Sequence, residues 1–334
     1  MHLNELQARL KAKRFLVVGS LNIDEIAKVN AIPPDDGCAR IERLQTEFGG
    51  HAGNCACAIA RLGASVSVYG AVGDDPYGRT LLDDLESNGV QTGHVQQIRG
   101  VPTGRVIIPC FSDRRFMLMH RGANDALDAC AEELREMVRG FDAVVIFDPP
   151  ETVSAVLLTP APERFPKLYW SPGGLADRAS LHLLCFADAV IMNRVEIGNA
   201  FGDDAQRGLE AHLQSAGATH RFIETLGPEG ARMYSYHGCT YVPGFRATVA
   251  DETGAGDAFT AGFAAFESVG FKARESLLFA NAMGASAVER IGARAGLPDL
   301  RSLVERRDLV QKLAESTEHL PAATRGLSAF GGMS

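Results

Sequence analysis

The chain has 334 residues, of which 46% are hydrophobic and 22% are charged. These values are typical of a globular protein and exclude a disordered, collagen-like or coiled-coil chain. The net charge of −8 argues against nucleic acid or an anionic membrane as the main partner, although a local positive site would suffice for one anionic ligand.

Several features indicate a cytoplasmic protein. No apolar run approaches the roughly 20 residues that a membrane-spanning helix needs, and the N-terminus lacks the apolar segment of a signal peptide. The seven cysteines are an odd number, and Cys55, Cys57, Cys130 and Cys185 have apolar neighbours, so we expect buried, reduced thiols. Cys55 and Cys57 have no second Cys or His pair nearby, which disfavours a zinc site.

Strand-like and helix-like patterns alternate along most of the chain. Residues 1–13 form a short amphipathic extension, and residues 321–334 are expected to be a flexible tail. Between them, the alternation predicts an α/β fold with a parallel sheet covered on both faces. The expected strands are 15–19, 65–69, 143–147, 168–170, 189–192 and 221–225, and the clearest helices are 52–62 and 77–88.

Two stretches, residues 26–48 and 101–120, interrupt this alternation. Their period-two patterning and their Pro and Gly turns are typical of antiparallel strands, with a hairpin turn expected at Ser112 and Asp113. They are either edge strands of the main sheet or a small β-sheet that stands outside it. We favour the second interpretation, in which the small sheet is a lid on a domain that spans residues 14–320.

The segment from Asp251 to Phe259 (DETGAGDAF) carries the most chemical information. Gly254 and Gly256 flank the start of a helix, where a turn without Cβ atoms presents bare backbone N–H groups and the helix N-terminus adds partial positive charge. Such a site suits a phosphate, and Asp257 in the first turn is placed to take a proton from an attacking hydroxyl. The structural alternative is a Gly-rich turn with Asp as the helix N-cap.

Three further segments place polar side chains at the ends of predicted elements. The paired glycines of segment 48–54 (FGGHAGN) permit close approach of a ligand that Asn54 can bind, unless the segment is only a tight turn. Asn22 and Asp24 share one side of the chain after the first strand, where parallel sheets bind ligands. Segment 193–196 (NRVE) either orients hydrated Mg²⁺ or forms a helix cap.

In this order, these four segments resemble the ribokinase-like (PfkB-type) family of carbohydrate and nucleoside kinases. DETGAGDAF is highly specific to that family, and residues 49–78 resemble its N-terminal signature. Residues 193–196, 225–230 (TLGPEG) and 242–245 (VPGF) are similar to further family segments. The resemblance covers roughly residues 14–315 and implies a ribokinase-like three-layer α/β/α sandwich with a mostly parallel central sheet and a small β-sheet lid.

The resemblance implies ATP-dependent transfer of the γ-phosphoryl group to a hydroxymethyl group of a small carbohydrate, with a nucleoside as the alternative acceptor. Asp257 would be the general base, and the backbone amides of Gly254, Ala255 and Gly256 would form the anion hole. The resemblance implies a nucleotide site at Asn193, Glu196, Thr225, Gly227 and Asn281, with Mg²⁺ held through water near Asn193 and Glu196. The implied acceptor residues are Asn22, Asp24, Gly50, His51, Asn54 and Asp148.

The resemblance and the lid each imply one more property. Many relatives bind a monovalent cation, and a K⁺ ion would here be surrounded by Asp251 and the carbonyls of Thr253, Val288, Ile291 and Ala293. A homodimer through the lid is expected, because a second lid could cover its exposed strand edges.

The acceptor is the least determined part of the site. His51 stands where ribokinase itself has lysine, which puts ribose in doubt, and it either bonds an acceptor hydroxyl or simply faces the cleft. Arg121 either pairs with an anionic acceptor or forms a structural ion pair, and Arg105, Arg114 and Arg115 are open in the same way. A nucleoside would need an apolar slot, for which the lid offers Phe111, Phe116 and Met117 unless these form its core.

Other classes of protein fit the sequence less well. A catalytically silent sugar- or nucleotide-binding protein is disfavoured because Asp257 and both glycines of its motif are intact. A nicotinamide-dependent oxidoreductase would need G-x-G-x-x-G after the first strand, where this chain has GSLNID. A P-loop is absent from the sequence as well.

Overall fold

The structure is a computed structural model that describes residues 3–33, 35–111, 114–159, 166–173, 180–202, 208–209, 220–236 and 238–306. The predicted tail 321–334, the last residues of the predicted 14–320 domain and the predicted turn at Ser112 and Asp113 lie outside the described residues. Within the described residues, no helix is both long and apolar enough to span a membrane.

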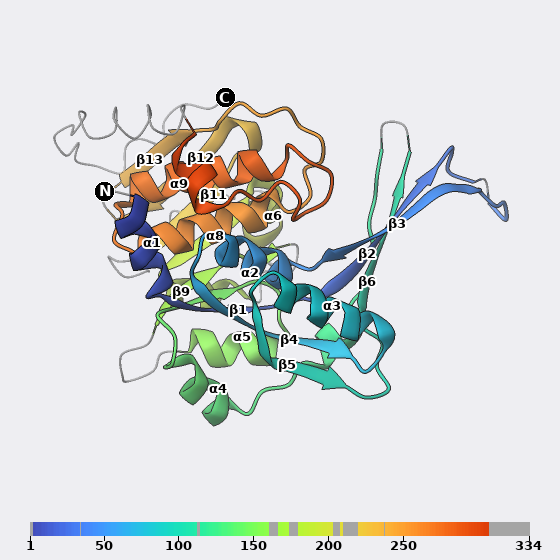
Figure 1. Ribbon diagram of the computed structural model, residues 1–334, viewed down its shortest axis with the longest axis horizontal. Coiled ribbons are helices and arrows are strands. Elements are labelled where there is room, and N and C mark those ends of the chain that lie inside the picture. The colour runs from blue at the N-terminus through green and yellow to red at the C-terminus, as the bar shows by residue number, and fades with distance from the viewer. Residues whose placement is uncertain are drawn as a thin grey trace.

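A nine-stranded sheet of described residues forms the centre of the fold, in the order β13-β12-β11-β10-β9-β8-β1-β4-β5 (Figure 1). The strands from β5 to β11 pair in parallel, whereas β12 and β13 are antiparallel because short turns connect them. The bounds are β1 Arg14–Val18, β4 Ser65–Gly73, β5 Gln91–Ile98, β8 Ala143–Ile146, β9 Lys167–Trp170, β10 Ala189–Asn193, β11 Arg221–Thr225, β12 Gly230–Ser235 and β13 Gly238–Pro243.

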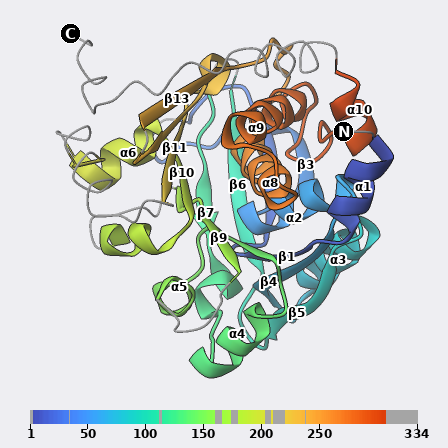
Figure 2. The same cartoon turned by 90° about the vertical axis from the view of Figure 1, so that its left-hand side faces the viewer.

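Helices cover both faces of this sheet (Figure 2). One face is covered by α1 (Leu3–Lys11), α2 (His51–Arg61), α3 (Pro76–Ser87), α8 (Ala255–Ser268), α9 (Ala273–Ala287) and α10 (Leu300–Val304). The other is covered by α4 (Ala131–Val138), α5 (Glu151–Leu158), the 3₁₀ segment η3 (Ser180–Phe186) and α6 (Arg194–Phe201). Strand β1 shows why, since Phe15 and Val17 enter the first core whereas Leu16 and Val18 enter the second. The predicted three-layer α/β/α sandwich is confirmed.

A second sheet, here called the small sheet, projects from one side of the sandwich (Figure 1). It consists of β2 (Asn22–Val29), β3 (Ile41–Gly49), β6 (Gly104–Cys110) and β7 (Leu118–His120), in the order β3-β2-β6-β7. The two outer pairs are antiparallel, as expected, but β2 and β6 pair in parallel. The prediction of antiparallel strands throughout was wrong here because α2, β4, α3 and β5 intervene, and so long a crossover permits parallel pairing.

The remaining differences between expectation and structure are local. Strand β4 runs four residues further than predicted, and β5, β12 and β13 were not predicted. Cys55 and Cys57 are buried free thiols, as expected, but Cys130 is exposed because it precedes the first turn of α4 at the surface. Cys185 is only partly buried.

The N-terminal segment packs on the body of the fold. Leu6 and Leu10 on one side of α1 are buried in the first core, and the guanidinium of Arg9 donates to the carbonyl of Val269 at 3.4 Å. The amphipathic pattern therefore supplies one apolar face to the core and one polar face to solvent.

Replacement of a buried leucine of α1 tests this packing. Leu10→Ala is expected to lower the free energy of unfolding by about 2–5 kcal/mol, because a fully buried side chain leaves a cavity. The exposed neighbour Lys11→Ala should change it by less than about 0.5 kcal/mol. Urea denaturation measures both, and equal effects of the two substitutions would show that α1 is not part of the core.

Candidate active site

The carboxyl ends of the central parallel strands bring several of the predicted site residues to one edge of the sheet. Residues 19–22 follow β1, Asp148 follows β8, Asn193 ends β10 and Thr225 ends β11. The amide of Ser20 donates to Asp148 Oδ1 at 3.0 Å, which joins the first two of these ends. Ligands of parallel sheets bind at this edge, so its side chains define the candidate site.

Among the described residues, no side chain caps the N-terminus of α8. Its N-cap is Gly254, with a left-handed φ of 78° and no side-chain cap, so the alternative in which Asp257 caps the helix is wrong. A Cβ on Gly254 would lie 2.8 Å from the Ala293 carbonyl oxygen, whereas a Cβ on Gly256 would meet no atom within 4 Å. The first turn therefore faces open space at Gly256, where helical N–H groups lack intrahelical acceptors. The Ala255 amide donates to the Glu252 carbonyl at 3.3 Å.

Asp257 lies in the first turn of α8 and is held by two side chains of α2. His51 Nδ1 lies 2.8 Å from Asp257 Oδ1, and Asn54 Nδ2 donates to Asp257 Oδ2 at 2.9 Å. The Asp257 side chain is only 8% exposed, but that of His51 is 44% exposed and stacks on Phe147. The predicted base therefore reaches the surface of the site beside an accessible imidazole.

The carboxylates around His51 favour its protonated form. Burial opposes its charged form, but the charge and hydrogen bond of the Asp257 carboxylate, aided by Asp148 and Glu196, raise the pKa of His51 to about 10. Of the two roles left open by the sequence, the structure shows neither alone, because His51 forms an ion pair with Asp257 while part of its ring remains accessible.

A buried arginine that sequence reasoning missed orients Asn54. Arg294 Nε donates to Asn54 Oδ1 at 3.0 Å, its Nη2 donates to the Gly49 carbonyl at 3.2 Å, and its Nη1 pairs with Asp84. With its oxygen occupied in this way, the Asn54 amide presents its NH₂ group to Asp257. A lone charged residue among the small residues of IGARAGL was the available signal.

Asp24 is a second buried carboxylate of the site. Gly49 lies against it so closely that a Cβ there would be 2.3 Å from Asp24 Oδ2. Burial, opposed by the charges of Arg294 and His51, raises the pKa of Asp24 to about 6. Within the described part of the chain, Asp24 Oδ1 is buried without a hydrogen-bond partner. A ligand hydroxyl is the kind of donor that such an oxygen needs.

The other predicted acceptor residues are largely engaged with the protein itself. Asn22 Oδ1 accepts from Asn124 Nδ2 at 2.8 Å, a partner that the sequence analysis did not single out. Gly50, with a φ of 85°, is the N-cap of α2 and packs against the backbone of residues 20–22. Asp148 Oδ2 accepts from Arg121 at 3.2 Å, so Arg121 forms the structural ion pair that was one of its two predicted roles.

The predicted nucleotide residues lie along the same edge. Asn193 and Glu196 form a reciprocal capping box at the start of α6, each side chain bonding the other's backbone amide at 2.9 Å. The pKa of Glu196 is raised, mainly because the carboxyl group is buried. The backbone hydrogen bond from Asn193 and the charge of His51 oppose this shift, whereas the charge of Asp257 adds to it. Gly227 opens the turn after β11 with a φ of 57°. Asn281 is buried and donates to the carbonyls of Val242 and Pro243, both at 3.2 Å.

The predicted K⁺ ligands surround a carboxylate that protein donors already occupy. Asp251 Oδ1 accepts from the amide and hydroxyl of Thr253 at 3.0 and 2.7 Å and from Arg115 at 2.9 Å. Its Oδ2 accepts from the Gly292 amide at 3.0 Å. The Val288 carbonyl accepts from the amides of Ala250 and Asp251 at 2.8 and 3.2 Å. These contacts leave little of the carboxylate for a K⁺ ion.

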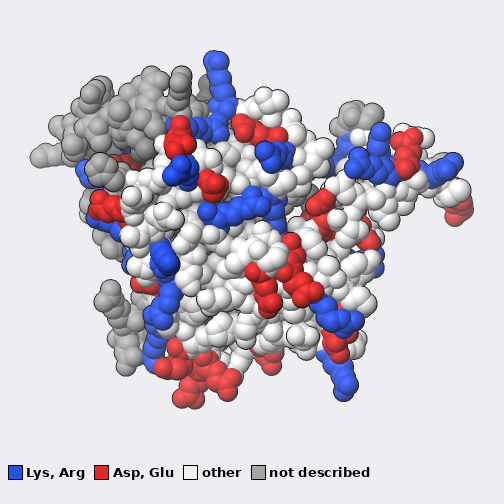
Figure 3. Space-filling model, in the orientation of Figure 1, with Lys and Arg blue, Asp and Glu red and all other residues white. Residues whose placement is uncertain are grey.

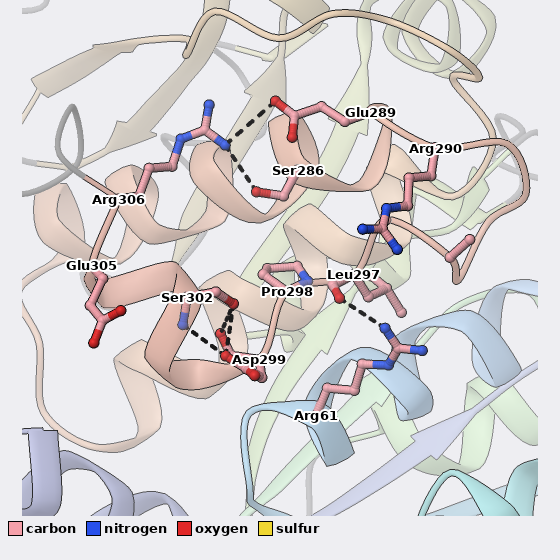
Figure 4. Close-up of a pocket in the computed structure, with 12 residues that line it drawn as sticks. Arg61, Ser286, Glu289, Arg290, Leu297, Pro298, Asp299, Ser302, Glu305 and Arg306 are labelled. Carbon is pink, nitrogen blue, oxygen red and sulfur yellow. Dashed lines mark hydrogen bonds and ion pairs between the residues drawn. The ribbon is translucent and has the colours of Figure 1, made fainter.

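A pocket outside the candidate site lies between α10 and the end of α9 (Figure 4). Its volume is about 820 Å³, but none of the predicted site residues lines it. Its cations Arg61, Arg290 and Arg306 are balanced by the carboxylates of Glu289, Asp299 and Glu305. Arg61 donates to the Leu297 carbonyl at 2.9 Å and Asp299 caps α10, so these polar groups have structural partners. On the face seen in Figure 3, Lys and Arg are interspersed with Asp and Glu and form no single basic surface.

Comparisons with known proteins agree with this geometry. A family model described as pfkB family carbohydrate kinase matches residues 12–300, and the chain belongs to that family. An ATP-dependent ribose-1-phosphate kinase of Halopiger xanaduensis is 31% identical over 287 residues, which cover 84% of this chain and 94% of the relative. A ribokinase of Lactococcus lactis is 27% identical over 289 residues, which cover 85% and 93%.

The similarity extends to solved structures. The crystal structure of ribokinase from Cryptococcus neoformans var. grubii serotype A in complex with ADP matches with a TM-score of 0.74 and 27% identity, covering 88% of this chain and all of that one. The chain is thus an ATP-dependent carbohydrate kinase.

The raised pKa of Asp24 predicts how the free energy of unfolding depends on pH. Because its folded-state pKa of about 6 lies above the unfolded value of 3.8, the folded protein binds more protons in that window, and stability falls as the pH rises through it. Asp24→Asn should therefore raise the free energy of unfolding by about 1–3 kcal/mol at pH 8 and change it little at pH 4. Urea denaturation at both pH values measures this, and a loss of stability at pH 8 would contradict the assigned ionisation.

Proposed function

We propose that this kinase transfers the γ-phosphoryl group of ATP to a hydroxymethyl group of a small carbohydrate, with Asp257 as the general base and the amides of Gly254, Ala255 and Gly256 as the anion hole. The observation that carries the proposal is the position of the Asp257 carboxylate. It stands in the first turn of α8, next to the open backbone at Gly256 and among groups that bind hydroxyls.

The acceptor is held by the polar groups around Asp257. Its reacting hydroxyl donates to the Asp257 carboxylate, and a second hydroxyl donates to the unpartnered Asp24 Oδ1. As the hydroxyl oxygen attacks the γ-phosphorus, its proton passes to Asp257, and the bond from phosphorus to the leaving oxygen of ADP breaks. Asn54 and His51 hold the carboxylate in place through their contacts with its two oxygens.

The nucleotide lies, in this proposal, between the N-terminus of α8 and the residues Asn193, Glu196, Thr225, Gly227 and Asn281. Negative charge that develops on the phosphoryl oxygens is stabilised by the amides of Gly254 and Gly256, and by that of Ala255 when it exchanges its 3.3 Å bond to the Glu252 carbonyl for the phosphate. The Glu196 carboxylate is of the type that holds hydrated Mg²⁺, and the ion would supply further charge neutralisation when bound. The capping box with Asn193 holds the Glu196 side chain at the start of α6.

The small sheet acts as the lid and as the dimer contact in this proposal. Its apolar side chains Ile41, Leu44, Ile107, Phe116, Leu118 and Met119 are all 40% or more exposed. Such a surface is rare on a monomer and is covered when two sheets associate. Closure of the sheet over the acceptor excludes water and limits ATP hydrolysis. The free buried thiols Cys55 and Cys57 suit a reducing cytoplasm.

A nucleoside is the second candidate acceptor, favoured by one feature. A cavity of about 360 Å³ between the small sheet and residues 249–253 has Ile26 and Ile108 in its wall. Ile26 and Asp24 share one face of β2, so an apolar surface continues from the acceptor carboxylate. The lid aromatics do not provide a separate slot, since Phe111 and Phe116 stack on each other at 6.0 Å.

A substrate panel separates the two candidates. ADP release is measured with ribose, ribose 1-phosphate, fructose, 2-keto-3-deoxygluconate, adenosine and inosine. The proposal expects substrate-dependent ADP release with one of the sugars, and release with a nucleoside alone would establish the alternative. Binding of a sugar without turnover by any compound would contradict a catalytic function.

Removal of the base should separate binding from turnover. Asp257→Asn is expected to lower kcat by about 10²-fold or more, because the general base is lost while the side-chain volume is kept. Affinities for ATP and acceptor, measured by calorimetry, should stay within about threefold. Glu252→Gln removes an exposed carboxylate of the same loop and should leave kcat unchanged. Full turnover by Asp257→Asn would remove Asp257 from its role.

Two glycines of the anion hole should respond differently to an added methyl group. Gly256→Ala is expected to abolish most activity without loss of stability, because its methyl group projects into the open space assigned to the phosphate. Gly254→Ala should lower the free energy of unfolding by about 1–2 kcal/mol or more, because its φ is positive and its Cβ would meet Ala293. Kinetics and urea denaturation of both variants check this, and a fully active Gly256→Ala enzyme would show that the phosphate does not bind at Gly256.

A further inference from the structure

An arginine of the small sheet reaches the loop that precedes the anion hole. Arg115 forms an isolated β-bridge with Cys110 at the end of β6, which fixes its position in the sheet. Its Nη1 atom lies 2.9 Å from Asp251 Oδ1 and 3.2 Å from Thr253 Oγ1. Arg115 thus joins the small sheet to the loop that precedes α8.

The carboxylate that Arg115 contacts is well buried and shapes the anion hole. The Asp251 side chain is 10% exposed, and its Oδ1 also accepts from the backbone amide of Thr253. Thr253 immediately precedes Gly254, the N-cap of α8. A group that holds Asp251 and Thr253 therefore also holds the turn from which the phosphate-facing amides project.

The same carboxylate was expected to bind K⁺, and the structure does not fit that expectation. The guanidinium, the Thr253 side chain and amide, and the Gly292 amide together occupy both oxygens of Asp251. A K⁺ ion bound there would lie close to a guanidinium of like charge, which disfavours its binding.

We propose that Arg115 is a positioning residue whose guanidinium supplies the positive charge beside Asp251, so that this kinase works without a monovalent cation. Arg115 touches neither phosphate nor acceptor, and acts through Asp251 and Thr253 on the turn at Gly254. Since Arg115 belongs to the small sheet, the anion hole takes its full order only when the sheet lies against the loop. The expected effects on kcat rest on the proposed function, whereas the expected effects on Tm do not.

The test compares three variants in two salts. Wild type, Arg115→Ala, Arg115→Lys and the control Arg114→Ala are assayed in KCl and in tetramethylammonium chloride at equal ionic strength. Arg114 is the adjacent arginine of the same hairpin and has an exposed side chain, so it controls for the loss of one positive charge. Each protein is also melted in both salts without substrates, which measures K⁺ binding independently of turnover.

Wild type and Arg114→Ala are expected to have the same kcat in both salts, within about twofold. Arg115→Ala should lose about tenfold or more in kcat in tetramethylammonium, the scale of one lost hydrogen bond to a charged group, and K⁺ should restore most of it. K⁺ should also raise the Tm of Arg115→Ala alone. Arg115→Lys keeps the charge and should need no K⁺.

Three results would overturn the proposal. The first is activation of the wild type by K⁺, and the second is a kcat of Arg115→Ala equal to that of the wild type in both salts. The third is a low kcat of Arg115→Ala that K⁺ does not raise, together with a Tm of that variant that K⁺ does not change. If no acceptor supports turnover by the wild type, the proposed function fails, and the Tm of Arg115→Ala in the two salts still decides this inference.

Discussion

The hydrogen bonds that fix Asp257 at the N-terminus of α8 are the constraint on which the site depends. Asn54 and His51 approach it from α2, and Arg294 holds Asn54 from the far side. Beside these contacts, the chain at Gly49 passes directly against Asp24. Two helices that are about 200 residues apart in the sequence are thereby joined at the proposed site of phosphoryl transfer.

The site holds several carboxylates close together, and the surrounding cations compensate them unequally. His51 pairs with Asp257 and Arg121 with Asp148, whereas Asp24 retains an unpartnered oxygen. The His51 pair favours folding below the unfolded pKa of 6.5, and that contribution is lost as the pH rises towards 10. The buried carboxylate of Asp24 opposes folding at neutral pH, a cost that agrees with the proposed binding of a hydroxyl group there.

Local patterns in the sequence predicted the architecture well, because buried strands and amphipathic helices have different hydrophobic periods. The glycines around Asp257 also predicted the turn that opens α8, where Gly254 has a left-handed φ that few other residues permit. The parallel pairing of β2 and β6 escaped prediction, because it depends on a connection of many residues rather than on a local pattern. Arg294 and the contact of Arg115 with Asp251 escaped for the same reason, as both join distant segments.

A crystal structure with a non-hydrolysable ATP analogue and the acceptor identified by turnover tests the central claim most directly. The account predicts that the terminal phosphate accepts hydrogen bonds from the first-turn amides of α8, and that the acceptor hydroxyl lies about 3 Å from the Asp257 carboxylate. A terminal phosphate bound away from Gly256, or an acceptor hydroxyl that faces another base, would contradict it.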